Sequence, residues 1–225
     1  IVGISIFSIG KNKSLYKTNS NKSFVVASNM KLFTTATALV YLGVDFEYKT
    51  KILYRGNISS DGKLDGDIVI KGSGDPNISG RFFEGEITAV PAYWADAVKR
   101  QGIKVITGDI IADDSIFDRE FVHDSWPKEQ LSEWYCAPIS GLSFNDNCID
   151  IVLKPNNKPG DLVSIQIEPK TSYVEIINKC KTTTLKSKHS YSFHRKPFTN
   201  RINDYDSFEM GEQIFYLSKN NTRKF

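Results

Sequence analysis

The chain has 225 residues, 40% hydrophobic and 12% aromatic, which is enough for the core of one large domain or two small ones. Its 29 basic and 26 acidic residues give a net charge of +3 and are scattered along the chain, which argues against a nucleic-acid partner. No apolar run approaches the roughly 20 residues that span a bilayer.

The first elements predicted are a β-hairpin and a helix. Residues 1–27 alternate around a turn with Gly and Asn, as two short strands do. From Met30 onward apolar residues recur at spacings of three and four, which predicts a helix over 29–42 that ends at Gly43. The first residues lack a Met, a basic region and a long apolar stretch, so we expect a start inside a domain with any leader missing.

The middle of the chain is predicted to be mostly β. In residues 46–80, short strands are broken by Gly, Asp and Asn, and DGKLDGDIVIKGSGDP predicts a hairpin or meander that ends in a tight turn. VPAYWADAVKRQGIK predicts an amphipathic helix, with Pro91 in its first turn and Gly102 after its end. KVITGDIIADDSIF predicts an alternating strand that contains a turn.

The last third continues with strands after an aromatic loop at residues 120–140. NCIDIVLKP and LVSIQIEP predict two strands, and SYVEIINKCKTTT predicts a further strand pair. Weak strand signals follow at 191–193 and 212–217. This order of elements predicts an α+β fold with a β-rich insertion.

The sequence shows no metal or cofactor motif. No two cysteines have CxxC spacing, and the three histidines do not complete a zinc pattern. Cys136 and Cys148 either pair in an oxidising compartment or remain, with Cys180, as buried thiols.

Ser28 and Lys31 open the helix over 29–42 and are the candidate catalytic pair. Residues three apart on a helix share one face, so the lysine can take the proton that makes a serine hydroxyl nucleophilic. The positive end of the helix dipole favours the alkoxide and the developing oxyanion. The alternative is a helix cap followed by a solvated lysine. Four other Ser-x-x-Lys matches fall in predicted turns or loops: Ser8/Lys11, Ser14/Lys17, Ser60/Lys63 and Ser125/Lys128.

The wider string VVASNMKLFTTATAL closely resembles the active-site segment of penicillin-binding proteins, with Val26 in place of the usual proline. The nearest resemblance is to peptidase family S13, the class C low-molecular-mass D-Ala-D-Ala carboxypeptidases/endopeptidases. DGKLDGDIVIKGSGDPNIS, IKVITGDIIADDSIFD and WYCAPISGLSFNDNCIDIVLKPNNKPGD match that family in type and order, over roughly residues 1–170. The resemblance implies that residues 1–45 belong to a β-lactamase/transpeptidase-like domain and that 46–225 form a β-rich inserted domain, without the C-terminal remainder of the catalytic domain.

The family completes its site with Ser-x-Asn and Lys-Thr-Gly motifs. Lys-Thr-Gly is absent, because the Lys-Thr pairs at residues 17, 49, 170 and 181 are followed by Asn, Lys, Ser and Thr. Ser143-Phe144-Asn145 leads into a strand, so we interpret it as a turn, and Ser218-Lys219-Asn220 has no helix after it. We therefore expect this chain alone to be inactive.

The resemblance implies a serine-type D-Ala-D-Ala carboxypeptidase or endopeptidase that acts on peptidoglycan through an acyl-enzyme on Ser28, with Lys31 as base. Asp113 and Phe117 would contact the stem peptide, the alternative being an Asp-Asp turn before a core Phe. β-Lactams would acylate the serine; no metal or other cofactor is implied. We expect a periplasmic or extracytoplasmic location, with peripheral membrane contact. The alternatives are a serine β-lactamase and a non-catalytic module that binds peptidoglycan or a partner.

Overall fold

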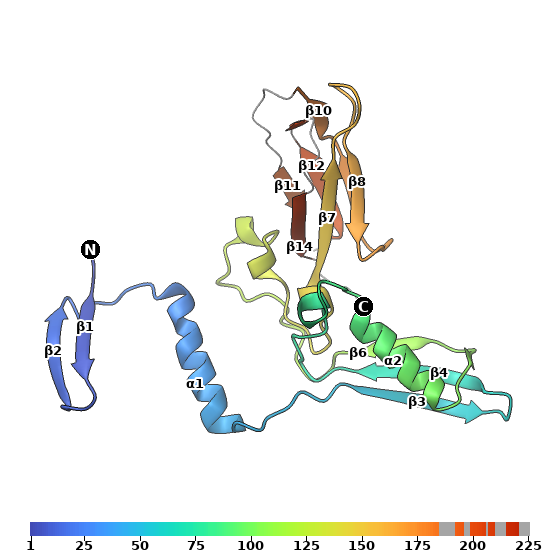
Figure 1. The fold of residues 1–225 in the computed structure, drawn as a ribbon, viewed down its shortest axis with the longest axis horizontal. Coiled ribbons are helices and arrows are strands. Elements are labelled where there is room, and N and C mark those ends of the chain that lie inside the picture. Colours follow the sequence, from blue (N-terminus) through green and yellow to red (C-terminus); the bar gives the residue numbers. More distant parts are fainter. Residues whose placement is uncertain (185–191, 196–198, 206, 210–214, 221–225) are drawn as a thin grey trace. The chain divides into compact units, whose positions relative to one another are not determined.

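The computed structural model describes residues 1–184, 192–195, 199–205, 207–209 and 215–220. The chain divides into two compact units, Ile1–Glu47 and Tyr48–Phe225. Figure 1 labels the elements of both units.

The first unit contains the predicted hairpin and helix. Strands β1 (Ile4–Ser8) and β2 (Lys13–Thr18) pair antiparallel, with an irregularity in register between Ile6 and Phe7. A short 3-10 helix, η1 (Ala27–Asn29), leads into α1 (Met30–Leu42), which ends at Gly43 with φ of 83°. Both sequence predictions are confirmed within a residue or two. Helix α1 has no buried residue, although its composition is strongly apolar.

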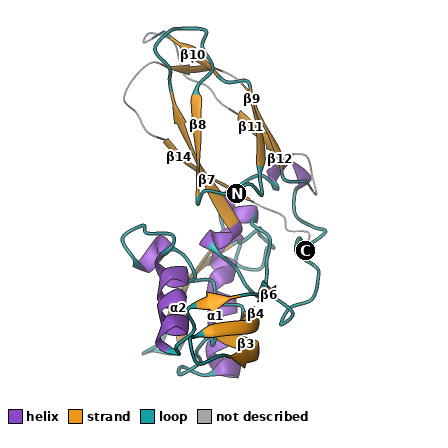
Figure 2. Cartoon of the chain, turned by 90° about the vertical axis from the view of Figure 1, so that its right-hand side faces the viewer, coloured by secondary structure: helices purple, strands orange, loops and turns teal. Residues whose placement is uncertain are grey.

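The second unit begins with a four-stranded mixed sheet. Strands β3 (Lys51–Ile58) and β4 (Lys63–Lys71) form the predicted antiparallel hairpin. Strands β5 (Val105–Ile106) and β6 (Ile110–Asp113) both pair with the other edge of β4 in parallel. The segment KVITGDIIADDSIF, predicted as one strand that contains a turn, therefore forms two short strands, β5 and β6, along the same edge of β4. Helix α2 (Ala89–Arg100) precedes β5 and runs alongside this sheet (Figures 1 and 2).

The aromatic segment at 120–140 is a loop, as predicted, interrupted only by single turns of 3-10 helix. The 3-10 turns of this unit are η2 (Gly80–Phe82), η3 (Lys128–Gln130), η4 (Trp134–Cys136) and η5 (Asn145–Asn147).

The remaining strands form three small sheets (Figure 2). Strand β7 (Cys148–Lys154) lies between β8 (Ser164–Glu168) and β14 (Phe215–Asn220), antiparallel to both. Strand β12 (Arg201–Tyr205) lies between β11 (Ser192–Arg195) and β9 (Glu175–Asn178). Strands β10 (Lys181–Thr183) and β13 (Ser207–Glu209) pair in parallel.

One strand prediction is wrong in its pairing. The segment SYVEIINKCKTTT forms two strands, β9 and β10, but they do not pair with each other. Each pairs in parallel with a later strand, β9 with β12 and β10 with β13. The two weak signals near the end correspond to β11 and β14, while residues 191 and 212–214 lie outside the described residues.

The main core of the second unit lies around β7. The fully buried side chains of Ile151, Leu153 and Ile202 pack with Cys180 and neighbouring apolar residues. All three cysteines are buried thiols that form no disulfide, so of the two alternatives for Cys136 and Cys148 the structure shows buried thiols. Among the described residues, no helix is long and apolar enough to cross a membrane.

Candidate functional site

Ser28 and Lys31 are brought together at the start of α1. The Nζ atom of Lys31 donates a hydrogen bond to Ser28 Oγ over 3.2 Å. Ser28 lies in η1, and the N-cap of α1 is Asn29, whose side chain makes no capping bond. Ser28 is therefore not the side-chain cap that the alternative interpretation of this serine requires.

The residue before the serine has an unusual backbone. Ala27 adopts φ of 43°, in the left-handed region that non-glycine residues avoid. Such a conformation costs about 1–3 kcal/mol and is found most often at functional sites. Ala27 is the first residue of η1, so this conformation lies directly before the exposed Ser28.

The pair is exposed, and so is the helix that carries it. A lysine acts as a base only when it is neutral, which requires loss of solvation or nearby cations. The arrangement places a candidate nucleophile and a candidate base at hydrogen-bonding distance, and their activation would require a surface that covers them.

Asp113 ends strand β6 in the second unit. Its Oδ1 accepts a hydrogen bond of 3.0 Å from the Ser115 backbone N–H, and its Oδ2 lies 3.8 Å from Lys71 Nζ. Hydrogen bonds from Ser115, from its side chain first and then its backbone, and the charge of Lys71 lower the pKa of Asp113. These contacts favour the ionised form of the carboxylate.

Phe117 packs against Gly74 in the loop after β4. A Cβ on Gly74 would lie 2.6 Å from the ring of Phe117, and the glycine has φ of 80°. The ring is 43% exposed, so it supports the glycine loop with one side and leaves part of its surface open. Asp75, next in that loop, accepts a hydrogen bond from Asn77 N at 2.9 Å, which is the predicted turn chemistry.

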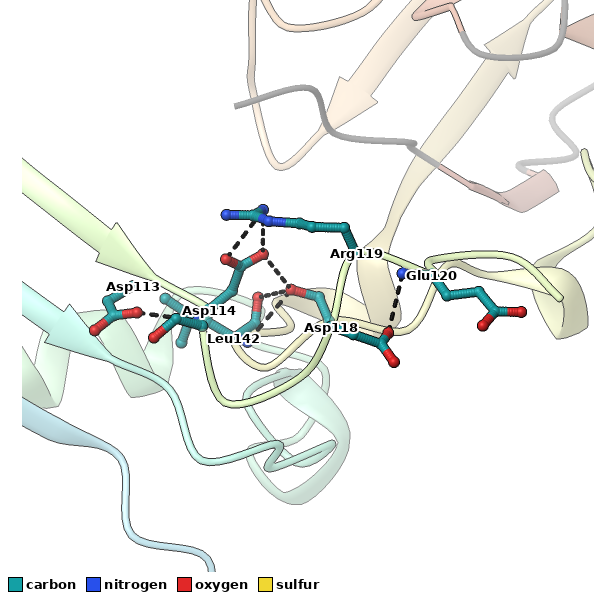
Figure 3. A network of polar contacts seen from close by, with 8 residues as sticks. Asp113, Asp114, Asp118, Arg119, Glu120 and Leu142 are labelled. Carbon is teal, nitrogen blue, oxygen red and sulfur yellow. Dashed lines mark hydrogen bonds and ion pairs between the residues drawn. The ribbon is translucent and has the colours of Figure 1, made fainter.

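Asp114 is the residue that sequence reasoning missed. Its side chain is only 7% exposed, and Arg119 Nη1 lies 3.3 Å from its Oδ1. The buried hydroxyl of Ser140 donates to Asp114 Oδ2 over 3.4 Å. Figure 3 shows Arg119 over Asp114 while Asp113 turns away from the pair. Of these two neighbouring aspartates, Asp114 is therefore buried in structural contacts and Asp113 remains partly exposed. The sequence of the dipeptide does not indicate which of the two is buried.

Ser143 and Asn145 serve the loop itself. Ser143 Oγ donates to Ser140 O at 3.2 Å and accepts from Asn147 Nδ2 at 3.1 Å. Asn145 Nδ2 donates to Cys148 O at 3.3 Å. These bonds fit the interpretation of a turn. The other triplet, residues 218–220, lies within strand β14. No group of three or more metal-ligating side chains occurs in the described ranges.

The chain matches one known protein family over most of its length. The model of the D-Ala-D-Ala carboxypeptidase 3 (S13) family matches residues 1–203. The chain belongs to this family. The sequence-based resemblance is thereby confirmed over a longer stretch than its motifs covered.

Two curated relatives show how much of such a protein is present. The D-alanyl-D-alanine carboxypeptidase DacB of Haemophilus influenzae is 29% identical over 166 residues, which cover 74% of this chain and 33% of the relative. The D-alanyl-D-alanine carboxypeptidase of Actinomadura sp. (strain R39) is 27% identical over 208 residues, which cover 90% of this chain and 37% of the relative. The chain thus spans about a third of the length of these relatives.

A solved structure shares the fold. Penicillin binding protein 4 (dacB) from Haemophilus influenzae superposes with a TM-score of 0.77 at 23% identity, over 98% of this chain and 47% of that one. The same protein complexed with a novel β-lactam gives a TM-score of 0.66 at 22% identity. The α+β prediction, a transpeptidase-like part with a β-rich portion, is confirmed at the level of the fold.

Proposed function

We propose that this chain supplies the nucleophile and base of a serine-type D-Ala-D-Ala carboxypeptidase or endopeptidase that acts on peptidoglycan. The observation that carries the proposal is the 3.2 Å contact between Lys31 Nζ and Ser28 Oγ at the head of α1, in a chain of the S13 family. Residues 1–45 would belong to the transpeptidase-like domain and 46–225 to the inserted domain.

The chemistry follows from the pair. A neutral Lys31 takes the Ser28 proton while Oγ attacks the carbonyl carbon of the penultimate D-Ala. The terminal amine leaves with a proton returned by Lys31, and an ester remains on Ser28. Water then hydrolyses this ester. Both groups lie near the N-terminus of α1, whose dipole stabilises negative charge as it develops on oxygen.

Asp113 and Phe117 are the residues proposed to contact the substrate. The accessible Asp113 carboxylate suits an amine on the stem peptide, and the open part of the Phe117 ring suits its apolar portion. β-Lactams would acylate Ser28 because their strained amide presents the same carbonyl to it. The expected location is periplasmic or extracytoplasmic, where the polymer lies.

The test is covalent labelling by a fluorescent penicillin. It is applied to the protein as the cell makes it and to the 225-residue chain. We expect stable label on the former, lost in Ser28→Ala and retained in Ser14→Ala, which alters a second Ser-x-x-Lys pattern. Label on neither form would refute the proposal and favour a binding module. Rapid release of the label would instead indicate a β-lactamase.

A further inference from the structure

A cavity of about 470 Å³ lies between α2 and the mixed sheet of the second unit. Its walls are almost entirely apolar. The sheet contributes isoleucines from β3, β4, β5 and β6, and α2 contributes Pro91, Trp94, Ala95, Val98 and Lys99. The residues that matter most here are Ile52, Ile70, Ile106, Ala112, Trp94 and Val98.

Helix α2 packs on the sheet beside this cavity through few side chains. The helix has no buried residue, although it runs beside an apolar surface. The small core of this sheet is formed by Leu64, Ile68 and Ile103, and within the described chain Val98 is the α2 side chain that packs on it. Trp94 faces the space and is only half-buried. A packed interior would close such a gap, since voids forfeit dispersion energy.

Two cations stand at the opening. Lys99 and Lys104 line the cavity and are both exposed. Lys104 is fixed by its backbone N–H, which donates to Gly62 O at 2.7 Å, and its stem passes over that glycine. Lys99 Nζ lies 3.1 Å from Asp96, an exposed pair that an incoming anion can replace at little cost.

We propose that this cavity binds a long-chain carboxylate, with the hydrocarbon chain inside and the carboxylate between Lys99 and Lys104. The apolar walls exclude a polar ligand, and the lysines favour a head group of negative charge. The volume lies within the roughly 300–1,000 Å³ of small-molecule sites. The proposal does not depend on the acyl-enzyme chemistry at Ser28.

The first measurement uses Trp94 as the reporter. A W126F/W134F variant leaves Trp94 as its single indole, because the chain has three tryptophans. A bromine-substituted dodecanoate should quench its emission saturably, and unlabelled carboxylates should compete. Each methylene buried should tighten binding about fourfold from decanoate to tetradecanoate. Absence of quenching, or affinities independent of chain length, would overturn the proposal.

The second measurement uses two alanines of α2. Both alanines are exposed, but Ala95 lines the cavity and Ala92, on the same helix, does not. Ala95→Phe should weaken tetradecanoate binding at least tenfold, and Ala92→Phe should leave it unchanged. Ala112→Phe fills the cavity from the sheet side and should act as Ala95→Phe does. Equal binding by all three variants would refute the site.

The third measurement tests the head group. Lys99→Glu with Lys104→Glu should weaken the carboxylate about fivefold or more and leave tetradecanol unaffected, while Lys51→Glu on β3 changes neither. Sedimentation with anionic vesicles provides the last comparison. Binding that appears only with vesicles, and persists in Ala95→Phe, would indicate adsorption to a bilayer surface and contradict the proposal.

Discussion

Lys31 donates to Ser28 Oγ from one helical turn away, and neither side chain is covered by the unit that carries it. The first unit therefore sets the distance between the proposed nucleophile and the proposed base and leaves both exposed. Activation depends on what surrounds the pair, because only desolvation or neighbouring cations leave a lysine neutral near pH 7.

The Lys31→Arg variant distinguishes the role of Lys31 as a hydrogen-bond donor from its proposed role as a base. Arginine still donates to a nearby hydroxyl but stays protonated at every accessible pH. We expect the rate of penicillin acylation in the cell-made protein to fall about 10²–10⁴-fold, as for loss of a general base. Lys17→Arg, in the hairpin, is the control. Acylation at the unaltered rate in Lys31→Arg would rule out Lys31 as the base.

Gly74→Ala should destabilise the second unit by about 2 kcal/mol. The alanine must adopt φ of 80° and its Cβ meets the Phe117 ring at 2.6 Å. Gly102→Ala, at φ of 84° in open space, should cost only about 1 kcal/mol. Urea unfolding measures both. Adding Phe117→Leu should recover part of the Gly74→Ala loss, and strict additivity would show that ring and glycine are not coupled.

Asp150→Asn should stabilise the protein at neutral pH. Burial, and then the charges of Glu168 and Asp146, raise the pKa of Asp150 in spite of a hydrogen bond from Asn145. When folding raises the pKa of a carboxyl group, the free energy of unfolding decreases as the pH rises from the pKa of the unfolded state through that of the folded state. The gain in Asp150→Asn should therefore be present at pH 7 and disappear below the ordinary carboxyl range. Thermal unfolding at pH 7 and pH 3 checks this, and a gain at pH 3 alone would contradict it.

Ile151→Ala should cost about 2–5 kcal/mol, because this side chain is fully buried in the core around β7. Val105→Ala, at 54% exposure on β5, should cost less than about 1 kcal/mol. The comparison is made by chemical denaturation. Similar losses for the two variants would mean that the core around β7 does not determine stability.

Local patterns predicted the local elements well. Helix α1 follows from the spacing of its apolar residues, and the β3–β4 hairpin from alternation around Asp61-Gly62. The pairing of β9 and β10 was wrong because proximity along the chain favoured a hairpin, whereas each strand is completed by a partner that lies later in the sequence. Periodicity identifies a strand but not its neighbour.

The candidate site shows the same division. The Ser28–Lys31 contact follows directly from helical geometry. That Asp114, rather than Asp113, is buried under Arg119 depends on the approach of residues 140–142, which no spacing within the Asp-Asp dipeptide encodes. Likewise, an amphipathic pattern does not specify how closely α2 packs on the sheet beside the cavity.

The placement of β7 between β8 and β14 has a consequence for synthesis. β8 leaves the ribosome shortly after β7, but the other edge of β7 waits until Phe215–Asn220 has been made. An unpaired edge of apolar sequence is a template for association with other chains. During translation, this edge of β7 is therefore open to association with other chains until β14 has been made.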